Sequence, residues 1–173
     1  MAPGAIVAAF GTALATRVET ATTVPLPTNL AGTTALVKDS AGTERAASLF
    51  FVSPGQVNFA IPTATAVGTA TLTIRSGDGI TSTGTLDVKT VAPAIFTANA
   101  NGQGVPAAVA LRVLGNGQQN YETIAVFDAA LGRQRPRPLD LSPTGDRVYL
   151  ILFLTGTQRA ADPNNDGNRN ESV

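Results

Sequence analysis

Oxygen-bearing side chains recur at alternate positions near the end of the sequence, in Asp162-Pro-Asn-Asn-Asp-Gly167. This spacing fits D-x-N-x-D-G, the first half of a calcium loop, in which alternate oxygens converge on one cation and the glycine permits a sharp turn. The candidate Ca²⁺ ligands are Asp162, Asn164, Asp166, Asn168 and Glu171. An EF-hand would need a bidentate glutamate at loop position 12, where this chain has Val173. Two interpretations stay open: a calcium loop of modest affinity, or a surface turn rich in Asn and Asp that binds no metal.

Most residue types that build catalytic sites are missing. The 173 residues include no Cys and no His, which excludes thiolate nucleophiles, disulfides, imidazole bases and ordinary zinc sites. Paired carboxylates facing each other across a cleft would be enough for glycoside hydrolysis. Aspartates that could form such a pair lie scattered at loop ends instead: Asp39, Asp78, Asp128, Asp140 and Asp146. We therefore expect a protein that is not an enzyme and that uses no cofactor unless it binds Ca²⁺.

Composition also restricts the binding partners. Twelve basic and twelve acidic residues cancel, so no electrostatic footprint for nucleic acid or for an anionic membrane is present. The same balance leaves little repulsion between identical subunits. Carbohydrate binding usually uses exposed aromatic rings, and because the chain has no Trp, the best candidate is Tyr121, next to the turn at Asn116-Gly117. By contrast, Phe10, Phe50, Phe59 and Phe153 lie in apolar strand contexts and are expected in the core.

The elements that position these residues are predicted to be β-strands. Short runs rich in Thr and Val alternate with Gly, Pro, Asn and Asp about every ten residues, as in β-sandwiches. The predicted strands are Ile6–Ala15, Thr33–Lys38, Ser48–Val52, Gln56–Ile61, Gly68–Arg75 and Thr81–Lys89, and Ser76–Gly79 is predicted to form a hairpin turn. The apolar start of the chain resembles a signal peptide. Its first basic residue is Arg17, however, so a buried strand is the better interpretation, and no span of a membrane is predicted.

The organisation changes near Val91-Ala-Pro93. About ninety residues precede this point, the size of one immunoglobulin-like sandwich. A hairpin is predicted after it, from Ala107–Leu114 and Tyr121–Asp128. The segment Arg133–Pro138 is interpreted as a solvated, polyproline-like connector. The run Val148–Leu154 is apolar on both faces and must be covered on both sides.

Several segments resemble one family of proteins. They are Phe10-Gly-Thr12, Val24–Pro27, Leu49–Phe59 with Pro62, Ala92–Phe96 and Asn101–Gly104. The whole chain resembles the uncharacterised secreted acidobacterial family first noted as a C-terminal domain in Solibacter, which is built from IPT/TIG-like immunoglobulin folds. The resemblance implies an extracellular or cell-surface protein whose export signal is not present in this chain. It carries over no catalytic residues.

The same resemblance implies that Val148–Gly156 opens a second sandwich, which would need further strands. The sequence stops at Val173, so two explanations stay open. The chain is a fragment of a longer multidomain protein, or the missing strands come from a neighbouring subunit by strand addition, which can propagate into a filament. The expected interface residues are Val148, Leu150, Leu152, Leu154, Ile6 and Phe10.

Together these observations predict an all-β chain. Residues 1–91 are expected to form an Ig-like (IPT/TIG-like) β-sandwich, and residues 92–173 a β-hairpin connector with the opening strand of a second, incomplete sandwich. The expected function is that of a non-catalytic extracellular structural or adhesive protein, a homo-oligomer or filament subunit. The alternative is a carbohydrate- or protein-binding surface module.

Overall fold

The structure, a computed structural model, describes residues 1–142 and 144–157. The described chain consists of antiparallel β-strands without a helix, which confirms the predicted all-β class. It divides into two compact units. Met1–Pro93 with Gly156 belongs to the first unit, and Ala94–Thr155 forms the second.

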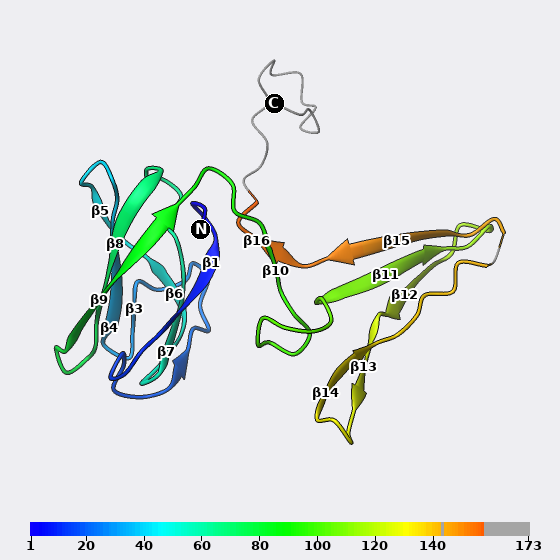
Figure 1. The fold of residues 1–173 in the computed structure, drawn as a ribbon, viewed down its shortest axis with the longest axis horizontal. Coiled ribbons are helices and arrows are strands. Elements are labelled where there is room, and N and C mark those ends of the chain that lie inside the picture. Colours follow the sequence, from blue (N-terminus) through cyan, green and yellow to red (C-terminus); the bar gives the residue numbers. More distant parts are fainter. Residues whose placement is uncertain (143, 158–173) are drawn as a thin grey trace, which may run out of the picture. The chain divides into compact units, whose positions relative to one another are not determined.

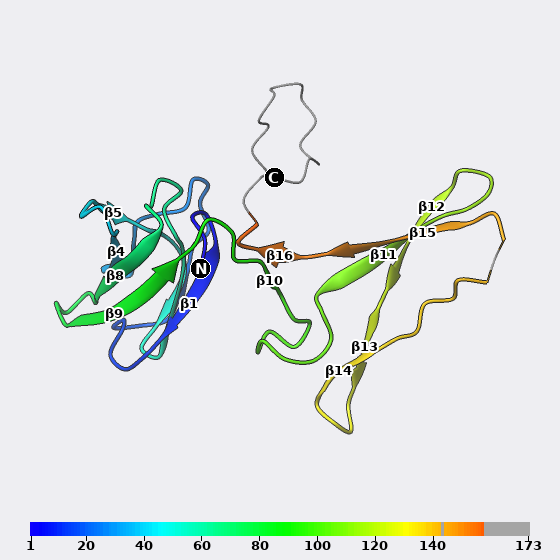
Figure 2. The same cartoon turned by 45° about the horizontal axis from the view of Figure 1, so that its top comes forward.

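The described part of the first unit contains nine strands in two sheets. They are β1 (Ile6–Phe10), β2 (Glu19–Thr20), β3 (Asn29–Leu30), β4 (Thr33–Lys38), β5 (Glu44–Ala46), β6 (Ser48–Ser53), β7 (Gln56–Ala60), β8 (Gly68–Arg75) and β9 (Thr81–Val88). One sheet has the order β1-β7-β6-β2, and the other has the order β3-β4-β8-β9 with β5 also paired to β4. Figures 1 and 2 show these two layers side by side, an arrangement compatible with a β-sandwich.

The core of the first unit lies between its two sheets. Alternate residues point inward because strand side chains have a period of two, and β4 accordingly buries Ala35 and Val37. The opposite sheet contributes Leu49, Val57 and Phe59, which are almost fully buried. A register shift between Leu49 and Phe51 adds a bulge to β6.

Close backbone contact joins two turns of the first unit. The β8–β9 hairpin is the predicted one, since Arg75 pairs with Thr81 across the turn. A Cβ on Gly77 of this turn would lie 2.8 Å from the carbonyl oxygen of Ala31, and a Cβ on Gly32 would lie 2.9 Å from the Cα of Gly77. Gly32 also has a φ of +76°, so both turns need glycine to approach so closely.

Strand β1 differs from its prediction. The strand ends at Phe10 instead of continuing to Ala15, and it is the last strand of its sheet. Val7 and Ala9 pack against the core, whereas the side chain of Phe10 is 75% exposed. The expectation of a buried strand, with Phe10 in the core, was therefore wrong, because each strand of a two-layer structure has only one face against the core and Phe10 lies on the other face.

The second unit contains seven short strands. They are β10 (Ala94–Ile95), β11 (Ala108–Val113), β12 (Gln119–Thr123), β13 (Ala125–Asp128), β14 (Arg133–Pro136), β15 (Arg147–Leu152) and β16 (Leu154–Thr155). They form a three-stranded sheet of order β12-β11-β15, a β13–β14 hairpin and a β10–β16 pair. Both ribbon views show β11 between its two neighbours.

Two predictions for this unit need correction. The predicted strand Tyr121–Asp128 is divided into β12 and β13 around the buried Ile124. In the segment Arg133–Pro138, predicted as a solvated connector, residues Arg133–Pro136 form strand β14, and Gln134 pairs with Phe127 of β13. Proline is tolerated there because Pro136 ends the strand, where a missing backbone N–H breaks no ladder.

Candidate interaction surfaces

The outer face of the three-stranded sheet carries a row of large side chains. Tyr121, Leu111 and Tyr149 lie directly opposite one another on β12, β11 and β15, so all three side chains project from the same face. Tyr121 is 69% exposed and Tyr149 is 48% exposed, and these are the only tyrosines of the chain. The exposure of Tyr121 was predicted. That Tyr149 lies in the same row was not predicted, because the pairing register of β11 with its two neighbours decides it.

The same face continues in a second row. Ile151 of β15 lies opposite Val109 of β11, whose other neighbour is Thr123 of β12. Ile151 is exposed and Val109 is half-buried. The two rows make a largely apolar surface that carries two phenolic hydroxyls and the hydroxyl of Thr123, and we call it the tyrosine face.

Strand β15 is also exposed on its other face. Leu150 and Leu152 lie opposite Ala110 and Ala108. Leu150 is 52% exposed, and only Val148 of this face is half-buried against the core of the unit. In the described chain β15 has a partner strand on one side only, since it ends the order β12-β11-β15. β15 therefore presents an edge with apolar side chains on both faces.

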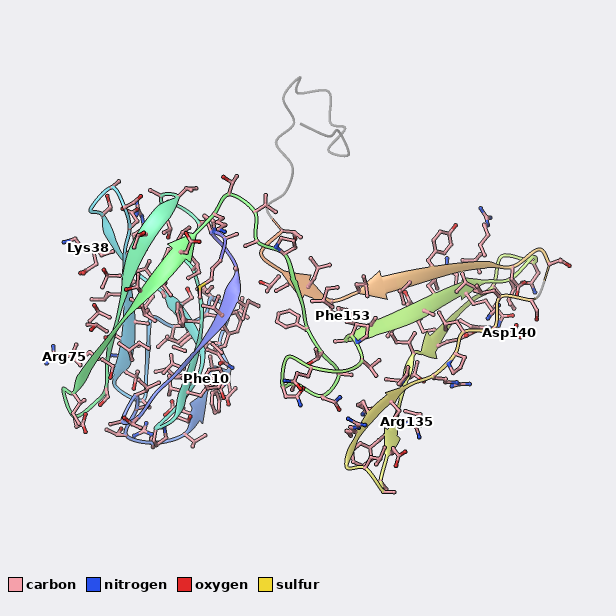
Figure 3. The ribbon with its side chains drawn as sticks, viewed as in Figure 1. Phe10, Lys38, Arg75, Arg135, Asp140 and Phe153 are labelled. Atoms are coloured by element: carbon pink, nitrogen blue, oxygen red, sulfur yellow. The ribbon has the colours of Figure 1, made fainter. Side chains whose placement is uncertain are left out.

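The predicted interface residues fall in two places. Val148, Leu150 and Leu152 are on β15, and Leu154 is on β16. Ile6 and Phe10 are on β1 of the first unit and project to its outer face. The run Val148–Leu154 was expected to open a second sandwich and to be covered on both sides, but its β15 part pairs with β11 of the hairpin and is exposed on both faces. Phe153, which was expected in the core, is half exposed, and Figure 3 shows it next to β15.

A buried arginine holds the inner face of this sheet. The Nε of Arg112 donates to Glu122 Oε1 at 2.5 Å, and its Nη2 donates to the carbonyl oxygen of Asp140 at 2.6 Å. Its Nη1 lies 3.4 Å from Asp146 Oδ2. The hydrogen bond that Arg112 donates to Glu122 raises the pKa of Arg112, and the same bond lowers the pKa of Glu122. This cluster ties β11 to β12 and to the loop that precedes β15.

A groove of about 630 Å³ with a mixed polar and apolar lining lies elsewhere in the second unit, and we call it the polar groove after its arginine and amide residues. One wall is the loop from residue 99 to residue 106, and the other is β14 with Gly132. Its polar lining consists of Asn99, Asn101, Gln103, Arg133, Gln134 and Arg135. In the sequence these residues belong to two separate segments, one around Asn101–Gly104 and the other the predicted connector Arg133–Pro138. The sequence shows that both segments are polar. It gives no sign that the two segments meet in the fold.

The Asn99 amide joins the two walls of this groove. Its Oδ1 accepts a hydrogen bond from the backbone N–H of Gln134 at 2.7 Å. Gly104, with a φ of +87°, lets Asn99 approach, since a Cβ there would lie 2.8 Å from Asn99 Nδ2. The loop is closed at its base by the Ala98 N–H, which donates to the carbonyl oxygen of Val105 at 2.9 Å. The groove is thus formed before any ligand arrives.

The predicted calcium ligands Asp162, Asn164, Asp166, Asn168 and Glu171 lie outside the described residues. Within the described ranges, no group of three or more acidic side chains is close enough to hold a metal ion. No helix there is long and apolar enough to cross a membrane. Comparison with family models, curated proteins and solved structures found no match to this chain.

Proposed function

We propose that this chain is a non-catalytic structural or adhesive protein of the bacterial cell surface that associates with its own copies through β15. The observation that carries the proposal is the exposure of Tyr149, Leu150 and Ile151 on a strand whose second edge has no described partner. Exposed apolar patches of this kind are rare on soluble monomers and mark interaction sites. An open strand edge pairs readily with another strand.

The proposed fold has the same basis. The first unit is proposed to be an Ig-like sandwich of the IPT/TIG type, supported by its two antiparallel sheets around one core. The second unit is proposed to be an incomplete sandwich. Its three-stranded sheet is packed on the inner face around Ala110 and Ile124, while the tyrosine face has no facing sheet among the described strands. A neighbouring copy would supply the missing layer or the missing strand, and a head-to-tail arrangement would grow into a filament.

The test is the state of assembly of the purified chain. We expect oligomers or filaments in sedimentation velocity and negative-stain electron microscopy at micromolar concentrations. Leu150→Lys places a charge on the open edge and is expected to yield monomers, since lysine on edge strands blocks pairing. Leu141→Lys is the matched control, because Leu141 is 74% exposed and lies outside the strands of this unit. A wild-type chain that stays monomeric at all concentrations would overturn the proposal.

Binding of carbohydrate is a second candidate function, and the tyrosine face favours it. Tyr121 and Tyr149 flank Leu111 on one flat exposed row, and aromatic rings with a polar tip suit partners that are apolar on one side and wet on the other. A glycan array should then give hits that Tyr121→Ala removes. Phe127→Ala is the control, since Phe127 is also exposed but lies on β13. An array without hits would reject this candidate.

A further inference from the structure

The polar groove between the loop at residues 99–106 and β14 has the features of a built ligand site. Its walls are fixed to each other by the hydrogen bond from Gln134 N–H to Asn99 Oδ1. The loop is held internally as well, since Asn101 Oδ1 accepts from the Gln103 N–H at 3.0 Å. A ligand that enters a preformed groove does not have to order it, so less affinity is lost to conformational entropy.

The charge in this groove has one sign. Two arginines line it and no carboxylate does. Arg135 is paired with Asp128, whose Oδ2 lies 3.1 Å from Arg135 Nη1. Arg133 forms no ion pair with any described residue. Its guanidinium is exposed, so the groove offers one planar cation with the fork geometry that matches a carboxylate.

The remaining polar lining is neutral. The neutral polar residues that line it are Asn99, Asn101, Gln103 and Gln134, and the first three lie on the loop that forms one wall. Each amide combines donors with an acceptor, and a sugar hydroxyl needs both. The apolar part of the lining is Val105 with two prolines, Pro106 and Pro136. One cation surrounded by amides suits a ligand with one carboxylate and many hydroxyls better than it suits a polyanion.

An extended acidic peptide fits less well. Peptides that add to a strand edge need free backbone donors. The outward N–H of Gln134 on β14 is already used by Asn99, and Pro136 has no N–H. Recognition in this groove must therefore come from side chains, as it does for sugars.

We infer that this groove binds an acidic saccharide, with the Arg133 guanidinium on the uronate carboxylate and the flanking amides on the hydroxyls. The residues of this site are not those of the β15 edge or of the tyrosine face. The inference therefore does not depend on whether the chain assembles. It adds a selective glycan contact to the second unit.

The experiment is calorimetric titration of the full chain with two oligosaccharides of neutral sugars that carry a single uronate residue, one galacturonate and the other glucuronate, and with their neutral methyl esters. We expect at least one acidic oligosaccharide to bind and its ester to bind about tenfold or more weakly, since hydrogen bonds to charged groups contribute most. Arg133→Ala should weaken the binding of the acidic oligosaccharide by a similar factor. Arg75→Ala, which removes an exposed arginine of the first unit, should leave binding unchanged.

Three results would overturn the inference. The first is that neither acidic oligosaccharide binds. The second is that an acid and its ester bind equally well. The third is that Arg75→Ala loses as much affinity as Arg133→Ala. Sodium acetate is included as a competitor. If acetate displaces the oligosaccharide at equal concentration, the groove recognises a carboxylate alone and the saccharide part is wrong. Far-UV circular dichroism of Arg133→Ala establishes that its fold is retained, which is expected for an exposed side chain.

Discussion

A single carboxylate organises one corner of the first unit. The side chain of Asp39 is almost fully buried and accepts hydrogen bonds from the backbone N–H groups of Ala41, Thr43 and Ala66. Arg45 Nη1 donates to it at 2.5 Å. The N–H of Ala66, followed by Thr43 and Arg45, lowers the pKa of Asp39, although burial acts in the opposite direction. The ionised form is thus the one that the fold stabilises.

This arrangement predicts a pH dependence of stability. Because folding lowers the pKa of Asp39, its contribution is fully present above the unfolded value of about 3.9. It is lost as pH falls through the lowered folded value. Asp39→Asn should lower the thermal midpoint of the first unit at pH 7 by about 5 °C or more, and it should flatten the loss of stability below pH 4. Asp87→Asn, at an exposed position, is the control for thermal melts between pH 2 and pH 7.

Glycine at the contact of two turns gives a second prediction at this scale. Gly77→Ala places a methyl group 2.8 Å from the carbonyl oxygen of Ala31, which is backbone and has little freedom to move. We expect a loss of about 1–3 kcal/mol in the free energy of unfolding, the usual range for overpacking. Gly84→Ala is the matched control, since a Cβ there meets nothing within 4 Å. It should be neutral or stabilising by up to about 1 kcal/mol. Equal losses in urea titrations of the two variants would contradict this account.

Strands with clear alternation could be predicted from the sequence almost to the residue. The predicted ranges Thr33–Lys38 and Gly68–Arg75 are β4 and β8, and in β8 the core side chains alternate with Thr and Arg. The prediction at Ile6–Ala15 was too long, since apolar content alone does not show that Gly11 ends pairing. β14 was missed because its charge and proline content conceal the ladder with β13.

The candidate sites were less predictable than the strands. The apolar run Val148–Leu152 indicates an interaction from its composition alone. The tyrosine face, by contrast, needs the register of β11 with two neighbours, and the polar groove needs Asn99 to meet Gln134 at a separation of 35 residues. Such long-range pairings depend on the geometry of the folded chain, which local patterns do not encode.

The Arg112 cluster gives a prediction at the scale of the sheet. Arg112→Ala leaves Glu122 and Asp146 without their shared cation, and removal of one partner from a buried ion pair is strongly destabilising. We expect amides of β11 and β12 to lose hydrogen-exchange protection, while amides of β4 and β8 keep theirs. Arg147→Ala, at an exposed end of β15, should leave both patterns unchanged. Arg112→Lys should restore little of the hydrogen-exchange protection, since an ammonium group lacks the planar fork with which the guanidinium reaches three partners.

At the scale of the whole molecule, the two units differ in how much core they have. Seventeen buried residues form the described core of the first unit, and three form that of the second. Hydrophobic burial is the main favourable term in folding. The second unit therefore has little of this stabilisation, while the first is a self-sufficient small domain by size and core. We expect the two units to unfold in separate transitions, with the second unit first.

This asymmetry links assembly to stability and gives the last prediction. If a second copy covers β15 and the tyrosine face, association binds the folded second unit and stabilises it by mass action. Its transition should then rise with protein concentration across a hundredfold range, while the transition of the first unit stays constant. Differential scanning calorimetry, with the tyrosine fluorescence of Tyr121 and Tyr149 to identify the second unit, measures both. In Leu150→Lys the concentration dependence should vanish, and in Leu141→Lys it should persist. A transition of the second unit that is independent of concentration in the wild-type chain would show that its own copies do not cover the exposed strand.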